Sequence, residues 1–213
     1  MGVSNKFRQR PFDKKRLEAF SDGVFAIVMT LLVLELRLPH IADPMDPHKV
    51  WDAIIEVMPV FFSWVVSFFF VALIWLHHHS ILKMSTGADY GTMWINTFLL
   101  FLICLLPFPT KIMGEYPMAP IIVMIWGILF SAATFVLTWF YYYNVKYYLA
   151  PTYDKKTAMK NVRFTVLGGP TIYIAAALLA FVSVYISYVI YALVPLLYIL
   201  PLDKEIEASK KPH

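Results

Sequence analysis

The stretch AFSDGVFAIVMTLLVLEL, residues 19–36, decides the fold class of this chain. From Val24 onward it is almost uninterrupted apolar sequence, and about 20 such residues in a helix cross the roughly 30 Å hydrocarbon core of a bilayer. Its beginning contains Ser21 and Asp22, and polar groups in membrane segments usually face protein or water rather than lipid. We therefore predict a spanning helix over residues 17–37 whose polar start has partners within the protein.

The composition extends this interpretation to the whole chain. Of its 213 residues, 60% are hydrophobic and 15% are charged, and the mean hydropathy is +0.65, whereas soluble domains have about a quarter charged residues. Six apolar runs predict transmembrane helices at residues 17–37, 54–76, 91–113, 119–143, 164–181 and 184–201. The last two are separated on length, because no charged residue occurs between Val166 and Leu202 and a single helix would exceed the bilayer thickness. The expected fold is an all-α integral membrane protein with a six-span domain at residues 17–202.

Lysine and arginine are unevenly distributed over the predicted loops. The leader, residues 1–16, is basic, whereas the connections after the first and third spans offer Lys49 and Lys111. The connection after the fourth span contains Lys146, Lys155, Lys156, Lys160 and Arg163. Because short cytoplasmic loops carry the excess of basic residues, both termini, including a tail at residues 203–213, are predicted to be cytoplasmic in a multi-pass protein of the cell membrane. The same distribution explains the net charge of +4 without nucleic-acid binding.

The first span has two different faces when it is drawn as a helix with 100° per residue. An apolar stripe with one hydroxyl lies within about 60° of Ile27, and its residues are Phe20, Gly23, Ile27, Thr30, Leu31 and Leu34. Asp22 lies about 140° away on the same count. Such a division suits a helix that polar contacts hold on one side and that presents an apolar stripe on the other.

Partners for the polar side are predicted from depth in the membrane. The second span ends in WLHHHS, residues 75–80, and the third begins near DYGTMWIN, residues 89–96. Both ends are expected at the level of Ser21 and Asp22, so we expect a buried network in which each polar group satisfies another away from water. Its candidate members are Arg16, Ser21, Asp22, Trp75, His77, His78 and Asn96.

Motifs for several other functions are missing from the sequence. There is no TVGYG filter loop, no Walker motif and no serine or cysteine nucleophile with a credible base. The side chains of His77, His78 and His79 point about 100° apart in a helix, so they cannot all bind one ion. We expect no metal, no cofactor and no enzymatic activity.

The sequence RLEAFSDGVFAIVMTLLVLEL, residues 16–36, resembles the transmembrane protein 175 family, potassium channels of bacteria and of the endolysosomal membrane. The family's Arg-x-x-x-Phe-Ser-Asp signature matches at Arg16, Phe20, Ser21 and Asp22. The WLHHH end of the second span and the LLPFPT of the third extend the likeness. With one signature in the chain, the protein resembles the bacterial members, which have a single six-helix repeat.

The resemblance implies a homotetramer in a lipid bilayer whose first helices line a central pore, with the signature residues supporting them from behind. By position, Ile27 matches the narrowest layer, and Leu31 and Leu34 match further layers toward the outside. Thr30 matches a threonine associated with potassium preference. The resemblance therefore implies a channel for potassium ions, with weaker sodium permeation, in which apolar side chains take the place of a carbonyl filter.

Two other function classes remain open at the level of the sequence. A proton-coupled secondary transporter could use Asp22 and the nearby histidines as a relay, and a non-conducting scaffold would show no flux. A carrier gives slow, saturating and coupled flux, whereas a channel gives discrete openings. Electrical recording distinguishes the three.

Overall fold

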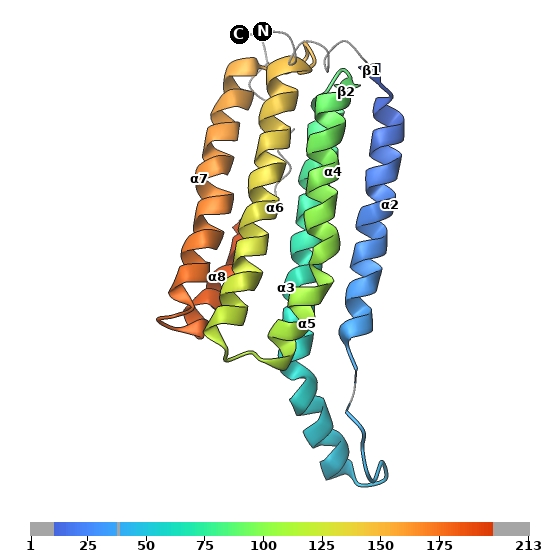
Figure 1. Cartoon of the computed structure of the whole chain (residues 1–213), viewed down its shortest axis with the longest axis vertical. Helices are drawn as coiled ribbons and strands as arrows, with labels where there is room; N and C mark the ends of the chain where they lie inside the picture. The colour runs from blue at the N-terminus through green and yellow to red at the C-terminus, as the bar shows by residue number, and fades with distance from the viewer. Residues whose placement is uncertain (1–10, 38, 198–213) are drawn as a thin grey trace, which may run out of the picture.

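The computed structural model describes residues 11–37 and 39–197, and long helices make up nearly all of this part (Figure 1). The elements are β1 (Pro11–Phe12), α2 (Lys14–Leu32), the 3₁₀ turn η1 (Val33–Glu35), α3 (Pro47–Met84), β2 (Ala88–Asp89), α4 (Tyr90–Leu105), α5 (Pro107–Glu115), α6 (Pro120–Tyr147), α7 (Lys155–Leu179) and α8 (Val184–Leu197). The all-α prediction is confirmed. Residues 1–10 of the predicted leader and the predicted tail lie outside the described residues.

Five segments are long and apolar enough to cross a bilayer, namely α2 with η1, α3, α4 with α5, α6 and α7. They coincide with the first five predicted spans. The predicted division of the last apolar run is found between α7 and α8. The described part of α8 has 14 residues, fewer than the about 20 of a full crossing, and the rest of the sixth predicted span, residues 198–201, is not described.

Several helices extend beyond the apolar runs that predicted them. α3 has 38 residues, and α7 begins at Lys155 rather than at 164. Asp46 accepts a hydrogen bond from the His48 backbone N–H, and Asp154 does the same for Thr157, which fixes these helix starts. Hydropathy therefore located the part of each helix that fits the hydrocarbon core, whereas capping residues set the ends.

The third predicted span is interrupted at Leu106, between α4 and α5. Pro107 and Pro109 have no backbone N–H, so the carbonyl groups one turn earlier lose their helical donors. The Thr110 hydroxyl donates to the Leu106 carbonyl (2.7 Å) and contacts the Ser67 hydroxyl on α3 (2.7 Å). This polar contact secures the bend against α3.

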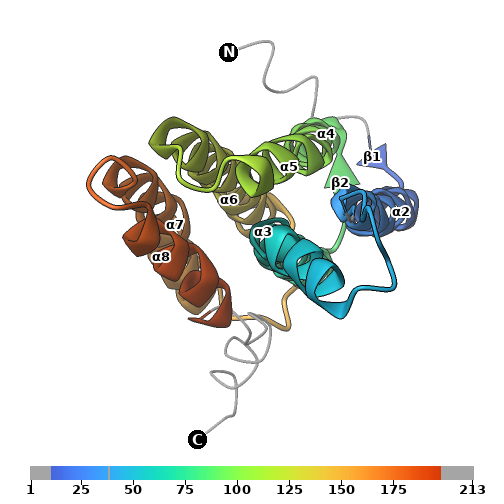
Figure 2. The same ribbon diagram turned by 90° about the horizontal axis from the view of Figure 1, so that it is seen from below.

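The helices run alternately up and down (Figure 1). β1, β2 and the turn between α6 and α7 lie at one end of the bundle, and the α2–α3 and α7–α8 connections lie at the other. Viewed along the bundle, α2 lies at one edge against α3 and α4, and α7 and α8 lie at the opposite edge (Figure 2). The first helix therefore has a side that the described part of the chain leaves uncovered.

Aromatic rings pack the α6–α8 side of the bundle. Phe70 of α3 stacks on Phe130 of α6 with ring centroids 3.8 Å apart, and Trp126 meets Tyr191 of α8 edge to face at 5.2 Å. Gly127 makes this closeness possible, because a Cβ there would collide with the Tyr191 hydroxyl. This half of the molecule is held by interdigitated rings.

Polar contacts join the elements at the end of the bundle where α2 begins. The Lys14 ammonium donates to the Ser85 carbonyl at the end of α3 (2.7 Å). Asp89, which is fully buried, accepts from the Thr92 backbone N–H (2.8 Å) and from the Tyr143 hydroxyl of α6 (2.9 Å). Burial by itself would raise the pKa of Asp89, but the hydrogen bonds from Thr92 and from tyrosine hydroxyls hold it below its usual value. The start of α2 is thus tied to α3, and the start of α4 to α6.

Candidate functional site

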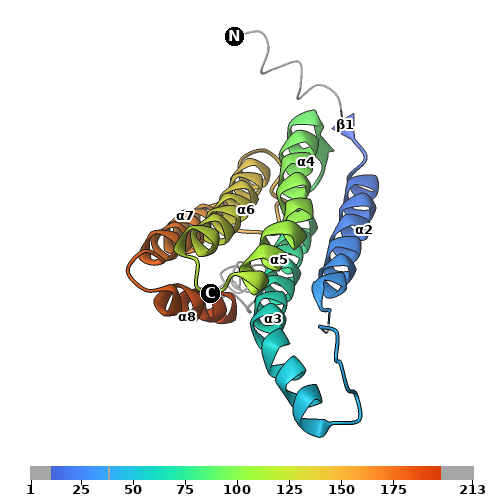
Figure 3. The same cartoon turned by 60° about the horizontal axis from the view of Figure 1, so that its bottom comes forward.

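The predicted stripe of α2 is exposed along its whole length. We call the set Phe20, Gly23, Ile27, Thr30, Leu31 and Leu34 the α2 stripe. Ile27 and Leu34 are each 59% exposed and Leu31 is 44% exposed, and a Cβ at Gly23 would meet nothing within 4 Å. Figure 3 shows α2 at the margin of the bundle, with α3 and α4 on one side of it only. The α2 stripe is therefore an apolar surface that residues 11–37 and 39–197 leave uncovered.

The opposite side of α2 is packed against the protein. Its buried residues are Leu17, Ser21, Phe25, Val28 and Leu32, spaced three or four apart as one helical face requires. Asp22 lies at the border of this face and is half-buried. The predicted separation of the polar side from the stripe is thus present in the packing of a single chain.

Thr30 carries the only hydroxyl of the α2 stripe. Its Oγ1 donates to the Ile27 carbonyl oxygen at 2.8 Å, which uses the hydroxyl proton and leaves the lone pairs available. In this position Thr30 can accept a hydrogen bond from water or contact a cation through oxygen.

A buried chain of hydrogen bonds holds α2 at its polar start. The Asn96 amide nitrogen donates to the Ser21 hydroxyl (2.9 Å), and its Oδ1 contacts His78 Nε2 (2.7 Å). All three residues are fully buried, and the His78 ring lies between Phe25, at 5.5 Å, and Phe140, stacked at 5.0 Å. Because these bonds are directional and buried, they fix the rotation of α2 relative to α3 and α4.

A second pair of contacts flanks this chain. Trp75 Nε1 donates to Asp22 Oδ1 at 2.8 Å, which brings together two residues that the sequence placed at one depth. His79 Nδ1 lies 3.3 Å from Glu18 Oε1, a contact absent from the predicted network. The signal for it was the spacing, since Glu18 and Asp22 are four apart on α2 and Trp75 and His79 are four apart on α3.

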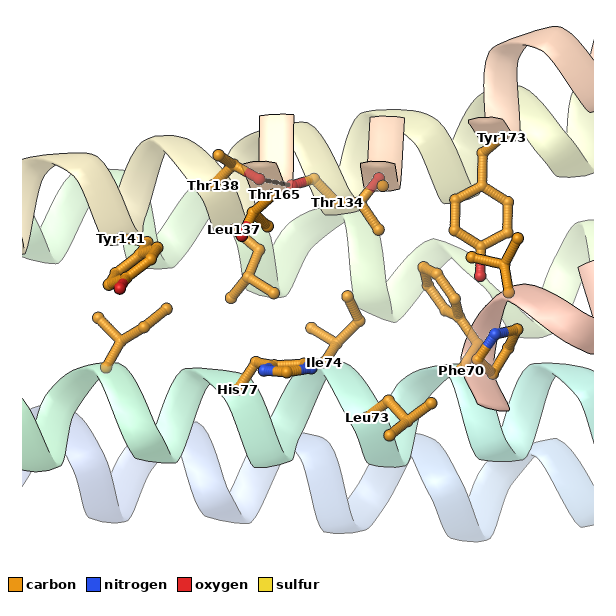
Figure 4. Close-up of a pocket in the computed structure, with 14 residues that line it drawn as sticks. Phe70, Leu73, Ile74, His77, Thr134, Leu137, Thr138, Tyr141, Thr165 and Tyr173 are labelled. Carbon is orange, nitrogen blue, oxygen red and sulfur yellow. Dashed lines mark hydrogen bonds between the residues drawn. The ribbon is translucent and has the colours of Figure 1, made fainter. Parts of the chain in front are cut away.

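The remaining predicted members of the network lie elsewhere. His77 lines an apolar cavity of about 50 Å³ between α3, α6, α7 and α8, near Ile74, Leu137 and Thr138 (Figure 4). Arg16 is exposed in the first turns of α2. Among the residues that the structure describes, no group of three or more His, Cys, Asp or Glu side chains could hold a metal ion.

Charged residues lie beyond the far end of the α2 stripe. Glu35 of η1 lies 3.8 Å from the Lys111 ammonium of α5, and Lys49 lies 3.8 Å from Asp43 and 3.9 Å from Asp46. These pairs are partly exposed and salt weakens them. The five groups in these pairs, two ammonium groups and three carboxylates, carry a net charge of −1.

Comparison with known proteins agrees with this arrangement. The family described as "Endosomal/lysosomal potassium channel TMEM175" matches residues 16–107, which contain the α2 stripe and both sets of polar contacts. The chain is 32% identical over 188 residues to a potassium channel of Chamaesiphon minutus, covering 81% of this chain and 86% of that protein. It is 30% identical over 200 residues to a potassium channel of a Chryseobacterium species, covering 93% and 98%.

A solved structure of a similar protein has the same fold. The crystal structure of a homolog of the lysosomal potassium-selective channel TMEM175, from Chamaesiphon minutus, superposes with a TM-score of 0.77 at 27% identity, over 87% of this chain and 95% of that one. Fold and sequence together define a multi-pass membrane channel rather than an enzyme. The chain belongs to the TMEM175 family.

Proposed function

We propose that four copies of this chain form a potassium-preferring cation channel whose pore is lined by the α2 stripes. The observation that carries the proposal is that α2 is fixed by buried hydrogen bonds on one side while Ile27, Leu31 and Leu34 are exposed on the other. Because the hydrogen bonds fix the rotation of α2, its exposed apolar side always points away from the bundle. There it faces either another copy of the chain or lipid. The named potassium channels among the relatives favour the first.

The constriction in this proposal is made of side chains. α2 is a continuous helix from Lys14 to Leu32, so its interior carbonyl groups are used within the helix and cannot form a filter. A ring of four Ile27 side chains excludes water when closed, and an ion at that level loses hydration without compensating ligands. The ring therefore acts as a gate, and Leu31 of α2 and Leu34 of η1 extend the apolar passage.

Thr30 supplies the polar layer of the same passage. The hydroxyl proton of each Thr30 is used within its own helix, so the oxygen lone pairs of four copies are available to the pore. They can replace or order a few of the waters that hydrate a permeating ion. Potassium gives up its hydration water more readily than sodium, so such a layer favours potassium. One ring of neutral oxygens discriminates modestly, and sodium is expected to permeate more weakly.

The signature residues brace this pore from behind. Ser21, Asn96 and His78 set the rotation of α2, and Asp22 adds a contact to Trp75. In this role the polar groups position the α2 stripe and do not touch the ion.

The orientation of the channel is proposed from the loops. Both termini are cytoplasmic, as the distribution of lysine and arginine predicts.

Electrical recording from the purified protein in planar bilayers, with potassium on one side and sodium on the other, tests the function. We expect discrete openings and a reversal potential shifted toward the equilibrium potential of potassium. The purified protein is expected to have the mass of a tetramer. Slow, saturating flux coupled to protons would instead support a carrier that uses Asp22 and the histidines, and absence of flux would support a scaffold.

Ile27→Asn tests the gate within that recording. Because an amide lets water persist in the constriction, we expect the current at rest to rise about tenfold or more, equivalent to a barrier lowered by about 1.4 kcal/mol. Ile128→Asn on α6 is the matched control, since Ile128 is also an exposed isoleucine of a spanning helix. Unchanged current in Ile27→Asn, or an equal rise in both variants, contradicts the gating role.

A further inference from the structure

A groove between α6 and α7 lies far from the α2 stripe. It encloses about 720 Å³ and is lined by Phe135, Thr138, Trp139, Tyr142, Met159, Val162 and Arg163. Phe135 and Trp139 are exposed in it, at 56% and 46%, and Arg163 is the one charged residue among its described lining residues. The groove is thus apolar along α6 with a single cation on α7.

The basic charge at this groove has little countercharge from its own helices. Lys156 and Lys160 are exposed with Arg163 on one face of α7, at spacings of four and three residues. The sequence of α6, α7 and α8 contains no acidic residue, and Asp154, which precedes α7, caps the start of that helix through the Thr157 backbone N–H (2.8 Å). Among the residues that the structure describes, the helices that line the groove offer Arg163 no carboxylate, so an anionic ligand can supply its countercharge.

The depth of the groove suits the headgroup region of a bilayer. Arg163 lies eight residues after Lys155, the first residue of α7, or roughly 12 Å along the helix axis. Trp139 and Tyr142 on α6 are the ring types that are enriched at membrane interfaces. An arginine at this level places its stem along apolar surface and its guanidinium among phosphates.

The position of α7 in the bundle favours lipid over a second copy as the occupant. α7 lies at the edge opposite α2 (Figure 2). If four α2 helices surround the pore axis, α7 is at the periphery of the assembly, and in this respect the inference rests on the proposed function.

We propose that the α6–α7 groove binds an anionic phospholipid, with the lipid phosphate at Arg163 and Lys160 and an acyl chain along Phe135 and Trp139. Guanidinium and phosphate form paired, charge-assisted hydrogen bonds. The apolar floor distinguishes this site from a loop whose charge only orients the protein in the membrane.

Quenching of Trp139 by brominated lipids tests the proposal. The full-length protein is reconstituted with phosphatidylglycerol or phosphatidylcholine that carries brominated acyl chains. Because the chain has six tryptophans, the signal of Trp139 is taken as the difference between the wild type and Trp139→Phe. We expect phosphatidylglycerol to bind about fivefold more tightly than phosphatidylcholine at this site, equivalent to about 1 kcal/mol for one basic side chain near an anionic surface.

Charge variants identify the residue responsible. Arg163→Gln should bring the ratio between the two lipids close to one, Arg163→Lys should retain most of it, and Lys160→Gln should reduce it. Lys15→Gln is the matched control, because Lys15 is an exposed lysine at the start of α2 and its loss changes the net charge by the same amount. We expect this control to keep the full ratio.

Three results would overturn the proposal: equal quenching by both lipids in the wild type, a preference that survives Arg163→Gln, or a preference abolished by millimolar inorganic phosphate. The first and third results need only the Trp139→Phe reference, and none of the charge variants has to fold. Absence of quenching by either lipid would mean that Trp139 faces protein, which contradicts the assembly around α2 as well. Equal quenching in a protein that conducts normally removes only the lipid site.

Discussion

The two edges of the bundle are held together by different physics. On the α2 side, Ser21, Asn96 and His78 form a buried chain of hydrogen bonds, and 28% of the residues in the apolar window of α2 are buried. On the α6–α8 side, rings such as Phe70 and Phe130 stack closely, and 44% of the corresponding window of α6 is buried.

The difference teaches how a membrane protein fixes a helix that it covers on one side only. Lipid is as apolar as a leucine side chain, so burial of apolar surface gives little drive for helix association in a bilayer. A helix with many close neighbours is held by van der Waals packing, as α6 is. α2 has neighbours on one side, and there directional polar bonds define which face remains open.

Gly127→Ala should have the largest effect of the four variants. It should lower the stability of the fold without changing conductance. The new Cβ collides with the Tyr191 hydroxyl and crowds Ala177, and overpacking of this kind costs about 3 kcal/mol. Thermal unfolding in detergent should show the loss, while the conductance of the remaining channels stays normal. Gly169→Ala on α7 is the matched control, since a Cβ there would make only ordinary contacts with Thr134, at 3.4 Å and beyond; equal losses in the two variants would show that the cost does not come from the collision at Tyr191.

Asn96→Ala should cost about 2 kcal/mol, because it leaves His78 Nε2 buried without its partner and removes the bond to Ser21. Unlike Gly127→Ala, it should also alter single-channel conductance, since α2 loses the bonds that set its rotation. Asn144→Ala serves as the comparison, because buried Asn144 donates to the Phe140 carbonyl of its own helix. Normal conductance in Asn96→Ala would contradict the bracing role.

Asp89→Asn should have a smaller effect, about 1 kcal/mol, as expected for a weakened helix cap. Burial would raise the pKa of Asp89, but hydrogen bonds from Thr92 and from tyrosine hydroxyls hold it below its usual value. The carboxylate therefore contributes stability above the usual pKa of an aspartate, and the contribution is lost as the pH falls through the lowered pKa. The stability difference between wild type and variant should therefore shrink below about pH 3.8. Asp154→Asn is the comparison, because Asp154 caps α7 in the same way through Thr157, whose hydrogen bonds lower its pKa as well. The same direction of change is expected there, and a difference at Asp89 that grows on acidification would refute the assignment.

Thr30→Ala should have the smallest effect. Loss of one ring of hydroxyls should lower the potassium-to-sodium permeability ratio roughly twofold. A twofold change corresponds to about 0.5 kcal/mol, which is at the low end of the net contribution of one hydrogen bond. Reversal potentials under asymmetric potassium and sodium measure it. Thr97→Ala on α4 is matched in geometry, since Thr97 is also exposed and donates to a carbonyl of the preceding turn, and an equal change in both variants would remove Thr30 from the selectivity argument.

Much of the fold could be predicted because the necessary information is local in the sequence. Apolar runs of about 20 residues identified the spans, and helical periodicity separated the face with Ile27 from the side with Asp22. The helix ends were less predictable, since Asp46 and Asp154 cap helices beyond the apolar runs. Depth along neighbouring spans also anticipated that Trp75 would meet Asp22.

Rotation about a helix axis is what the sequence left undetermined. His77, His78 and His79 share one depth but point about 100° apart, and only the packing of α3 decided that His78 meets Asn96, that His79 meets Glu18 and that His77 lines the cavity of Figure 4. The sequence by itself determined which segments enter the membrane and which side of α2 is apolar, because hydropathy and periodicity are properties of one segment. The tertiary structure decided which polar groups meet, because that depends on how each helix is rotated against its neighbours.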